Sequence, residues 1–143
     1  MLLALAATAC SGGTPEPARL DTKNESCGWC RMTVSNARFA AQIVVPAEEP
    51  RFFDDIGCLR NHLRERPAAS RAVVYVADHR TKAWVAAAGA VYTRVAGLET
   101  PMESHVIAHA DAASRDQDAD AKGGEPVPLA DLFGPGGPPG DHR

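Results

Sequence analysis

The sequence predicts one small α+β domain, built from two strand–strand–helix–strand units. Three observations support this class. The chain has 143 residues, which is enough for one compact domain with tails. Short runs of β-branched and apolar residues recur between turn residues, as is typical of strands. One segment among these runs has the apolar spacing of an amphipathic helix.

Six segments have the composition of strands, and turn residues separate them. The turn "PAEEP" follows the first strand, "HRTK" joins the third and fourth into a hairpin, and "AGLETPM" is a loop before the last. The last strand alternates between apolar and polar residues. In chain order the expected strands lie at 38–45, 51–53, 72–78, 83–88, 90–95 and 104–110.

A helix is expected between the second and third strands, over residues 54–66. Its apolar residues fall on one face, and Pro67 stops it. Either acid of the segment "FFDD" can cap its first turn, where free N–H groups need acceptors. The polar, alanine-rich segment 111–122 predicts a short surface helix. A short apolar patch at 127–133 is expected to dock on the domain.

The two ends of the chain differ from this folded unit, which spans residues 25–133. Residues 1–10, "MLLALAATAC", resemble the end of a bacterial lipoprotein signal, in which small residues precede a lipidated cysteine, here Cys10. A plain secretory signal is the alternative. Residues 11–24 predict a flexible linker. The Gly/Pro-rich residues 134–143 predict a disordered tail.

The composition argues against several functions. A net charge of -3 gives no sign of a nucleic-acid surface, which would need a basic excess or a basic stripe. No apolar run approaches the roughly 20 residues that span a bilayer. The sequence contains neither a G-x-S-x-G motif nor a phosphate-binding loop. No nucleic acid is therefore expected as a partner, and no enzyme class is indicated by a motif.

Sulfur side chains gather near the start of the domain. The stretch "ESCGWCRM" contains Cys27, Cys30 and Met32, and Cys58 lies on the expected helix. If Cys10 is lipidated, three cysteines remain in an exported protein, and an odd thiol there needs a reason. Metal binding is one such reason.

The mixture of thiols and thioethers favours a soft ion. Thiolate and thioether ligands favour Cu(I) among the physiological metals, whereas a thioether is a poor ligand for zinc. Met32 lies two residues after Cys30, so in extended backbone both side chains lie on one face. Met102 and His105 lie in a loop that Pro101 stiffens, and they can supply further ligands.

Other interpretations of these residues remain open. Cys27, Cys30, Cys58 and His62 can form a structural zinc site, because His62 follows Cys58 by one helical turn. The two cysteines of the CxxC motif can form a disulfide or act in redox catalysis, although a redox motif normally opens a helix after a strand. Cys58 and either methionine can also simply fill the core.

Several segments together resemble one protein family. In order, they are "CGWCRM", "RFAAQI", "FFDDIGCL", "VYVAD", "AWVAAAGAVY" and "TPMESHVIA". Their order and spacing resemble the NosL family, the copper-chaperone lipoproteins that accompany nitrous oxide reductase. The similarity covers roughly residues 25–110, with weaker agreement through Leu132. The family pattern includes C-x-x-C-G-M, "FDDIGC" and "TPMGSG".

This resemblance implies a fold similar to the core of the organomercurial lyases and one Cu(I) ion bound in the periplasm. It also implies that the copper passes to nitrous oxide reductase or its maturation machinery, for assembly of a copper–sulfide centre. The residues that match sulfur positions of the family are Cys27, Cys30, Met32, Cys58 and Met102.

The chain departs from the family pattern beside both methionines. Arg31 replaces the glycine of C-G-M, and "ESH" at 103–105 replaces "GSG". Glycine allows backbone geometries that arginine resists. A cation beside Cys30 is expected to favour its thiolate, and His105 can add an imidazole ligand.

We therefore expect a periplasmic carrier of one Cu(I) ion, anchored to the membrane by the lipid on Cys10 and without catalytic turnover. The expected ligands are Cys30, Met32 and Met102, with Cys27, Cys58 or His105 as further candidates. A disulfide between Cys27 and Cys30 would switch the site off, because metal binding needs reduced thiols.

Two alternatives to the copper carrier are retained. One is a structural zinc domain that uses His62. The other is a thiol-dependent, lyase-like enzyme, in which Cys30 or Cys58 would act with Asp55. This second alternative depends only on the likeness of folds, and fold does not imply function.

Overall fold

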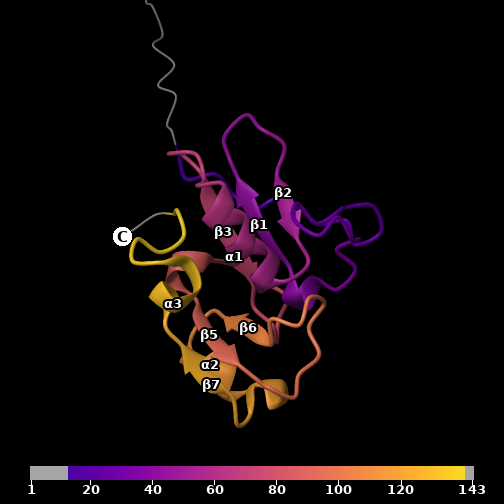
Figure 1. The fold of residues 1–143 in the computed structure, drawn as a ribbon, viewed down its shortest axis with the longest axis vertical. Helices are drawn as coiled ribbons and strands as arrows, with labels where there is room; N and C mark the ends of the chain where they lie inside the picture. Colours follow the sequence, from indigo (N-terminus) through magenta and orange to yellow (C-terminus); the bar gives the residue numbers. More distant parts are fainter. Residues whose placement is uncertain (1–12, 141–143) are drawn as a thin grey trace, which may run out of the picture.

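Residues 13–140 are described by a computed structural model, in which two antiparallel sheets are accompanied by short helices. In Figure 1 the first sheet and helix α1 occupy the upper half, and the second sheet, α2 and α3 the lower half. The strands are β1 (Ala41–Val44), β2 (Arg51–Phe53), β3 (Val73–Ala77), β4 (Trp84–Ala86), β5 (Val91–Arg94), β6 (Val106–His109) and β7 (Glu125–Val127). The helices are α1 (Ile56–Glu65), α2 (Ala112–Asp116) and α3 (Leu129–Phe133), with 3-10 turns η1 (Ala37–Phe39), η2 (Ala87–Gly89) and η3 (Ala119–Ala121). The α+β class is confirmed.

Both sheets follow one plan. The chain order β1–β2–α1–β3 recurs as β5–β6–α2–β7. The sheet orders are β2–β1–β3–β4 and β6–β5–β7, so the first strand of each unit lies between its second and third strands. All of these pairings are antiparallel. The two strand–strand–helix–strand units expected from the sequence are therefore present, and β4 extends the first sheet.

Helix α1 begins where the sequence places it. Asp55, one of the two acids expected as a cap, accepts a hydrogen bond from the Gly57 N–H at 2.6 Å through its carboxylate. Ile56 and Leu59 are buried on the inner face, and the helix ends before Pro67. Because α1 packs on β1, β2, β6 and α3, it contacts both halves of the molecule.

Several short elements differ from the expectation. The expected first strand begins with η1, and the expected fourth strand ends in η2. The expected surface helix over 111–122 is divided into α2 and η3. Strand β7 was not expected because it contains Pro126, but it lies at a sheet edge, where proline is tolerated. The apolar patch at 127–133 docks as expected, with Leu132 buried.

The segments at both ends lie against the first sheet. The Tyr75 hydroxyl donates to the Pro15 carbonyl at 2.6 Å, and the Val74 N–H donates to the Pro139 carbonyl at 3.1 Å. These contacts differ from the flexible linker and disordered tail that the Gly/Pro-rich composition predicted, because backbone carbonyls can dock without regular structure. Cys10 and the signal-like segment lie outside the described residues. In the part that is described, no helix has the length and apolar character needed to cross a membrane.

A backbone joint connects the two sheets. Asp78, directly after β3, forms a parallel bridge with Ala108 of β6, and the His79 N–H donates to the Ala108 carbonyl at 2.8 Å. The Asp78 carboxylate also accepts from the Ala110 N–H at 2.8 Å. The end of β3 and the end of β6 are thus fixed side by side.

Candidate metal centre

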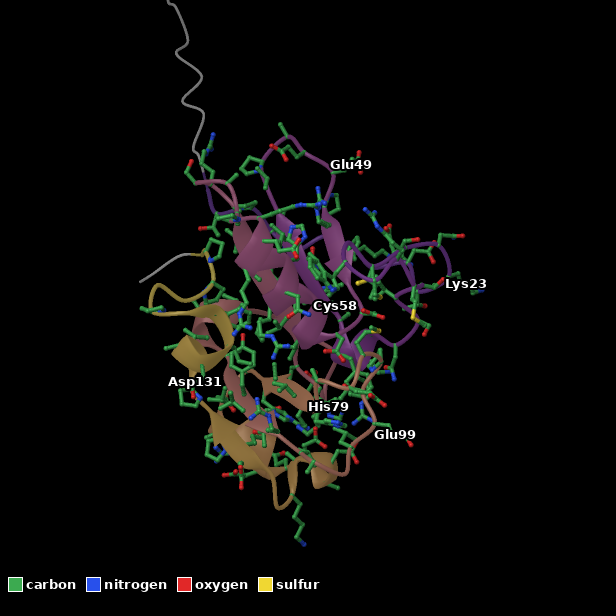
Figure 2. The ribbon with its side chains drawn as sticks, viewed as in Figure 1. Lys23, Glu49, Cys58, His79, Glu99 and Asp131 are labelled. Atoms are coloured by element: carbon green, nitrogen blue, oxygen red, sulfur yellow. The ribbon has the colours of Figure 1, made fainter. Side chains whose placement is uncertain are left out.

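Three cysteines and one aspartate meet at the N-terminal end of α1. Cys27 and Cys30 lie in the CxxC loop, Asp54 directly follows β2, and Cys58 lies in the first turn of α1. One potential ligand atom from each residue lies within 4.8 Å of those from the others. In Figure 2, sulfur atoms are grouped beside the Cys58 label. We call these four residues the cysteine cluster.

The CxxC loop is fixed by backbone hydrogen bonds. The Cys27 N–H donates to the Met32 carbonyl at 2.8 Å, which closes the loop on itself. The Gly28 N–H donates to the Phe52 carbonyl at 2.8 Å and ties the loop to β2. A Cβ atom on Gly28 would lie 2.7 Å from Cγ of Arg51, so any other residue there would force the Arg51 side chain to shift. These contacts place both thiols above the start of α1.

The three cysteines of the cluster differ in their exposure to solvent. Cys27 and Cys58 are buried, whereas Cys30 is partly exposed. All three are free thiols, so none of the described cysteines is in a disulfide. A soft ion from solvent would therefore reach Cys30 first and the two buried sulfurs afterwards.

The thiols have different proton affinities. A hydrogen bond from the Cys58 thiol lowers the pKa of Cys27 to about 6, and the same bond raises the pKa of Cys58. Burial raises the pKa of Cys30 to about 11, and its thiol donates to Asp54 at 3.4 Å. Near neutral pH the cluster therefore holds one thiolate, on Cys27, and two thiols. The Arg31 cation does not make Cys30 a thiolate, because burial raises the pKa of this thiol.

Asp54 is the member of the cluster that the sequence did not reveal. The segment "FFDD" indicated two acids at a helix start, and both were interpreted as possible caps. In the structure the two acids have different hydrogen-bond partners. Asp55 caps α1 and also accepts from the Met102 N–H at 3.0 Å, whereas Asp54 accepts from the Cys30 thiol. Only the path of the chain after β2 decides which carboxylate faces the thiols.

The two methionines lie at the surface on segments tied to the cluster. Met32 is 57% exposed and Met102 is 42% exposed. Their backbones are anchored by Cys27 and Asp55, respectively. Cys27, Cys30 and Cys58 are brought together as expected, and ligation by Met32 or Met102 stays a prediction.

The two histidines considered as ligands lie elsewhere. His105 directs Nδ1 to the Leu98 carbonyl at 2.8 Å and is not among the four residues of the cluster. His62 packs against the Phe53 ring, with ring centroids 5.1 Å apart, and is not among the four either. In the zinc alternative, Asp54 therefore takes the place that His62 was expected to fill. Ligation by His105 stays a prediction.

The departures from the NosL pattern lie in left-handed backbone. Arg31, Glu103 and His105 have φ angles of 69°, 54° and 55°. Glycine adopts such angles without steric cost, which explains glycine at these positions of the pattern. This chain therefore keeps the backbone geometry beside both methionines and places side chains where the pattern has none.

Comparison with known proteins identifies one family. The model of the NosL family matches residues 17–133, which is most of the chain. No curated protein and no solved structure gives a match. The likeness to the organomercurial lyase core therefore stays a prediction. A copper-related accessory role follows from the family, and the cysteine cluster is a group that can bind a metal.

Proposed function

The chain belongs to the NosL family, and on this premise we propose that it carries one Cu(I) ion and releases it to another protein. The cysteine cluster supports this most directly, because three sulfur atoms and one carboxylate lie within 4.8 Å of one another. Cu(I) prefers soft sulfur ligands, so such a group suits it better than a harder ion.

The proton positions suit uptake of a monovalent soft ion. Cys27 already offers a thiolate near neutral pH, because its pKa is lowered to about 6. The Cys30 thiol donates to Asp54 at 3.4 Å, so this carboxylate accepts a hydrogen bond from the proton that the ion would displace from the sulfur. Asp54 itself is a hard oxygen ligand and a poor match for Cu(I). Its role in the proposed carrier is therefore to position the Cys30 proton.

The exposure of the site suits release. Cys30 is partly exposed, and Met32 and Met102 lie at the surface, with Met32 hydrogen-bonded to Cys27 of the cluster and Met102 to Asp55 next to it. A receiving protein can approach these sulfurs while the buried Cys27 and Cys58 still bind the ion. Transfer then proceeds by exchange of one ligand at a time, without a free ion in solution.

We further propose that the domain works in the periplasm, tethered by a lipid on Cys10, and delivers copper for maturation of nitrous oxide reductase. Two features of the sequence support this. Residues 1–10 have the pattern of a lipoprotein signal, and the motifs of the chain resemble those of the copper chaperones of that enzyme. A lipid anchor would keep the carrier at the membrane, near its receiver.

Anaerobic titration of the reduced protein with Cu(I) against a competing chelator tests the carrier. One ion per chain in a sulfur-rich shell, seen by X-ray absorption, is the expected result. Met32→Leu and Met102→Leu remove one thioether each with little change in volume, and each should weaken binding if that sulfur is a ligand. Absence of Cu(I) uptake, or tight retention of zinc by the same sulfurs, would instead establish a structural site.

A thiol-dependent lyase-like activity is the second candidate. It is favoured by one observation, the contact between the Cys30 thiol and the Asp54 carboxylate, since two thiols with a proton-donating carboxyl are what such chemistry needs. The carboxylate concerned is Asp54 rather than the expected Asp55, which caps α1. Incubation with phenylmercury distinguishes the candidates, because a lyase releases benzene over many turnovers and a carrier only binds the mercury.

A further inference from the structure

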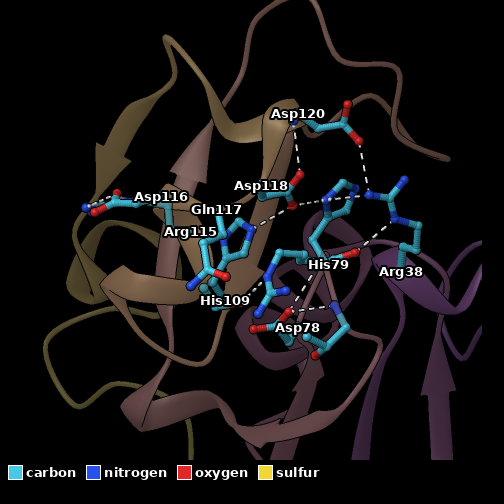
Figure 3. Close-up of polar contacts among 12 residues, drawn as sticks. Arg38, Asp78, His79, His109, Arg115, Asp116, Gln117, Asp118 and Asp120 are labelled. Atoms are coloured by element: carbon cyan, nitrogen blue, oxygen red, sulfur yellow. Dashed lines mark hydrogen bonds and ion pairs between the residues drawn. The ribbon is translucent and has the colours of Figure 1, made fainter.

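A second group of chemically active side chains lies in the lower half of the molecule. His79, His109 and Asp118 are all buried, and one potential ligand atom from each lies within 4.8 Å of the others. Nδ1 of His79 and Nε2 of His109 lie 2.7 Å and 2.9 Å from the same carboxylate oxygen of Asp118 (Figure 3). We call these three residues the histidine cluster.

Three separate segments build this cluster. His79 follows β3, His109 ends β6, and Asp118 caps η3 by accepting from the Asp120 N–H at 3.0 Å. The backbone joint between β3 and β6 fixes the two rings relative to each other, and η3 presents the carboxylate between them. Although burial alone would raise it, the hydrogen bonds from both rings lower the pKa of Asp118 to about 2.

The cluster contains polar atoms that the protein leaves without partners. Four buried side-chain nitrogen or oxygen atoms of the described residues have no hydrogen-bond partner, and three of them lie in this region. They are Nε2 of His79, Nδ1 of His109 and Oγ1 of Thr93. In each ring the unpartnered nitrogen is the one that does not contact Asp118, so only the two nitrogens that converge on this carboxylate are placed to bind a common ion.

A cavity adjoins the cluster. It has a volume of about 760 Å³, and its lining includes Asp118, Thr93, Asp116 and Lys122. Asp118 thus contacts the two rings and also belongs to the lining of the cavity. The cavity gives an ion a route to the buried carboxylate, which a site enclosed on all sides would lack.

We propose that His79, His109 and Asp118 bind a divalent first-row metal ion, with zinc as the representative, at a site separate from the cysteine cluster. Two imidazoles and a carboxylate are borderline-to-hard ligands of the kind that zinc accepts at about 2.0–2.2 Å. Zinc takes the place of the ring proton that now lies between each nitrogen and Asp118, and that proton moves to the other nitrogen of the same ring. Each ring stays neutral with its proton on its other nitrogen, so the negative carboxylate supplies the charge that holds the ion.

A nearby cation sets the strength of the site. One guanidinium nitrogen of Arg38 lies 3.4 Å from Nδ1 of His79 and 3.1 Å from a carboxylate oxygen of Asp120. This positive charge opposes a metal ion, and Asp120 offsets it in part. Arg38→Gln should therefore strengthen zinc binding, whereas it would weaken a cluster that served only as a hydrogen-bonded support.

Zinc titration of the reduced full-length protein tests the proposal. We expect zinc in a nitrogen and oxygen shell by X-ray absorption, with its affinity lowered on the order of 100-fold in Asp118→Asn. Asp116→Asn removes the same charge from the rim of the same cavity, and should leave the affinity unchanged. Zinc found only in a sulfur shell would overturn the proposal, because all of it would then be bound by the cysteine cluster.

A second measurement needs no substitution. Nitrogen–proton spectra of the imidazole rings in the wild-type protein should show zinc moving the signals of His79 and His109 while those of His62 and His105 stay in place. If all four rings keep their spectra during the titration, the proposal is wrong, whatever the variants do. Neither measurement uses copper, so the carrier function can fail while this site stands, and the reverse.

Discussion

The cysteine cluster and the histidine cluster are each built from three chain segments, but they differ in exposure and in the type of ligand atom. The first joins the CxxC loop, the end of β2 and the start of α1, and one of its thiols reaches the surface. The second joins the ends of β3 and β6 with η3, and all three of its side chains are buried. One group is soft and accessible, whereas the other is harder and enclosed.

This difference in exposure suits the cysteine cluster to passing an ion to another protein and the histidine cluster to keeping one. A partly exposed thiol lets a second protein supply ligands while the first protein still holds the ion. All three side chains of the histidine cluster are buried, so a second protein cannot supply ligands there, and an ion would leave through the cavity beside Asp118 without a shared ligand. One small domain can therefore combine a transferable ion with a resident ion, if both proposals hold.

The largest expected effect is on copper. Cys30→Ser should lower the Cu(I) affinity by more than about 100-fold, since loss of an outer hydrogen-bond partner alone costs 10–100-fold at metal sites. The same substitution should leave zinc binding at the histidine cluster unchanged. Parallel titrations with the two metals measure both affinities. If Cys30→Ser weakened both equally, the clusters would not be independent.

The histidine cluster should matter more for folding. Asp118→Asn should lower the free energy of unfolding of the metal-free protein by about 2 kcal/mol, because two buried rings lose a charged acceptor. Asp116→Asn, whose carboxylate is largely exposed, is the matched control and should change stability by less than about 0.5 kcal/mol. Urea denaturation in the presence of a chelator gives both values, and equal stabilities would contradict the prediction.

The pH dependence of binding should differ as well. Above about pH 6 Cys27 is a thiolate, whereas Cys30 keeps its proton up to about pH 11. An ion bound by both sulfurs releases one proton in this range, so its affinity rises about tenfold per pH unit.

Zinc at the histidine cluster should show no such slope. Burial lowers the pKa of His79, so its ring is neutral above the ordinary histidine value of about 6.5 and no proton needs to leave. Competition titrations at several pH values between about 6.5 and 8.5 measure both slopes. Parallel slopes for copper and zinc would show that the assigned proton positions are wrong.

The smallest expected effect concerns the backbone beside the cysteine cluster. Arg31→Gly removes left-handed strain of about 1–2 kcal/mol but adds about 0.4–1 kcal/mol of unfolded-state entropy. The net gain in stability should be roughly 0.5 kcal/mol. Ala47→Gly, in the turn after β1, has a similar φ of 65° and serves as the control. A clear loss of stability in Arg31→Gly alone would mean that the arginine side chain makes a contact that holds the loop.

Local signals were enough to predict much of the fold. The strand pattern, a cap by one of the two acids of "FFDD" and the stop at Pro67 are each set by residues close in sequence, and these elements are confirmed. Strand β7 escaped prediction because it is short and contains proline. It forms because β5 already offers an edge for it to pair with.

The sites were predictable where their residues are neighbours in sequence or match segments of the family pattern. The CxxC motif and its link to Cys58 could be inferred from spacing and from the family pattern. Asp54 could not be separated from Asp55, since both stand at a helix start. His79 and His109 had no assignable role, because only the joint between the sheets and the position of η3 bring them to Asp118.

The backbone joint between the two sheets also determines which amides report their separation during unfolding. The amide hydrogens of His79 and Ala110 are each bonded across from one sheet to the other. Fraying of either sheet alone leaves them protected, and only separation of the two halves exposes them to deuterium. The hydrogen-exchange rates of these two amides therefore measure the separation of the two halves. An ion that binds only the closed form, at either cluster, should slow both amides by the same factor.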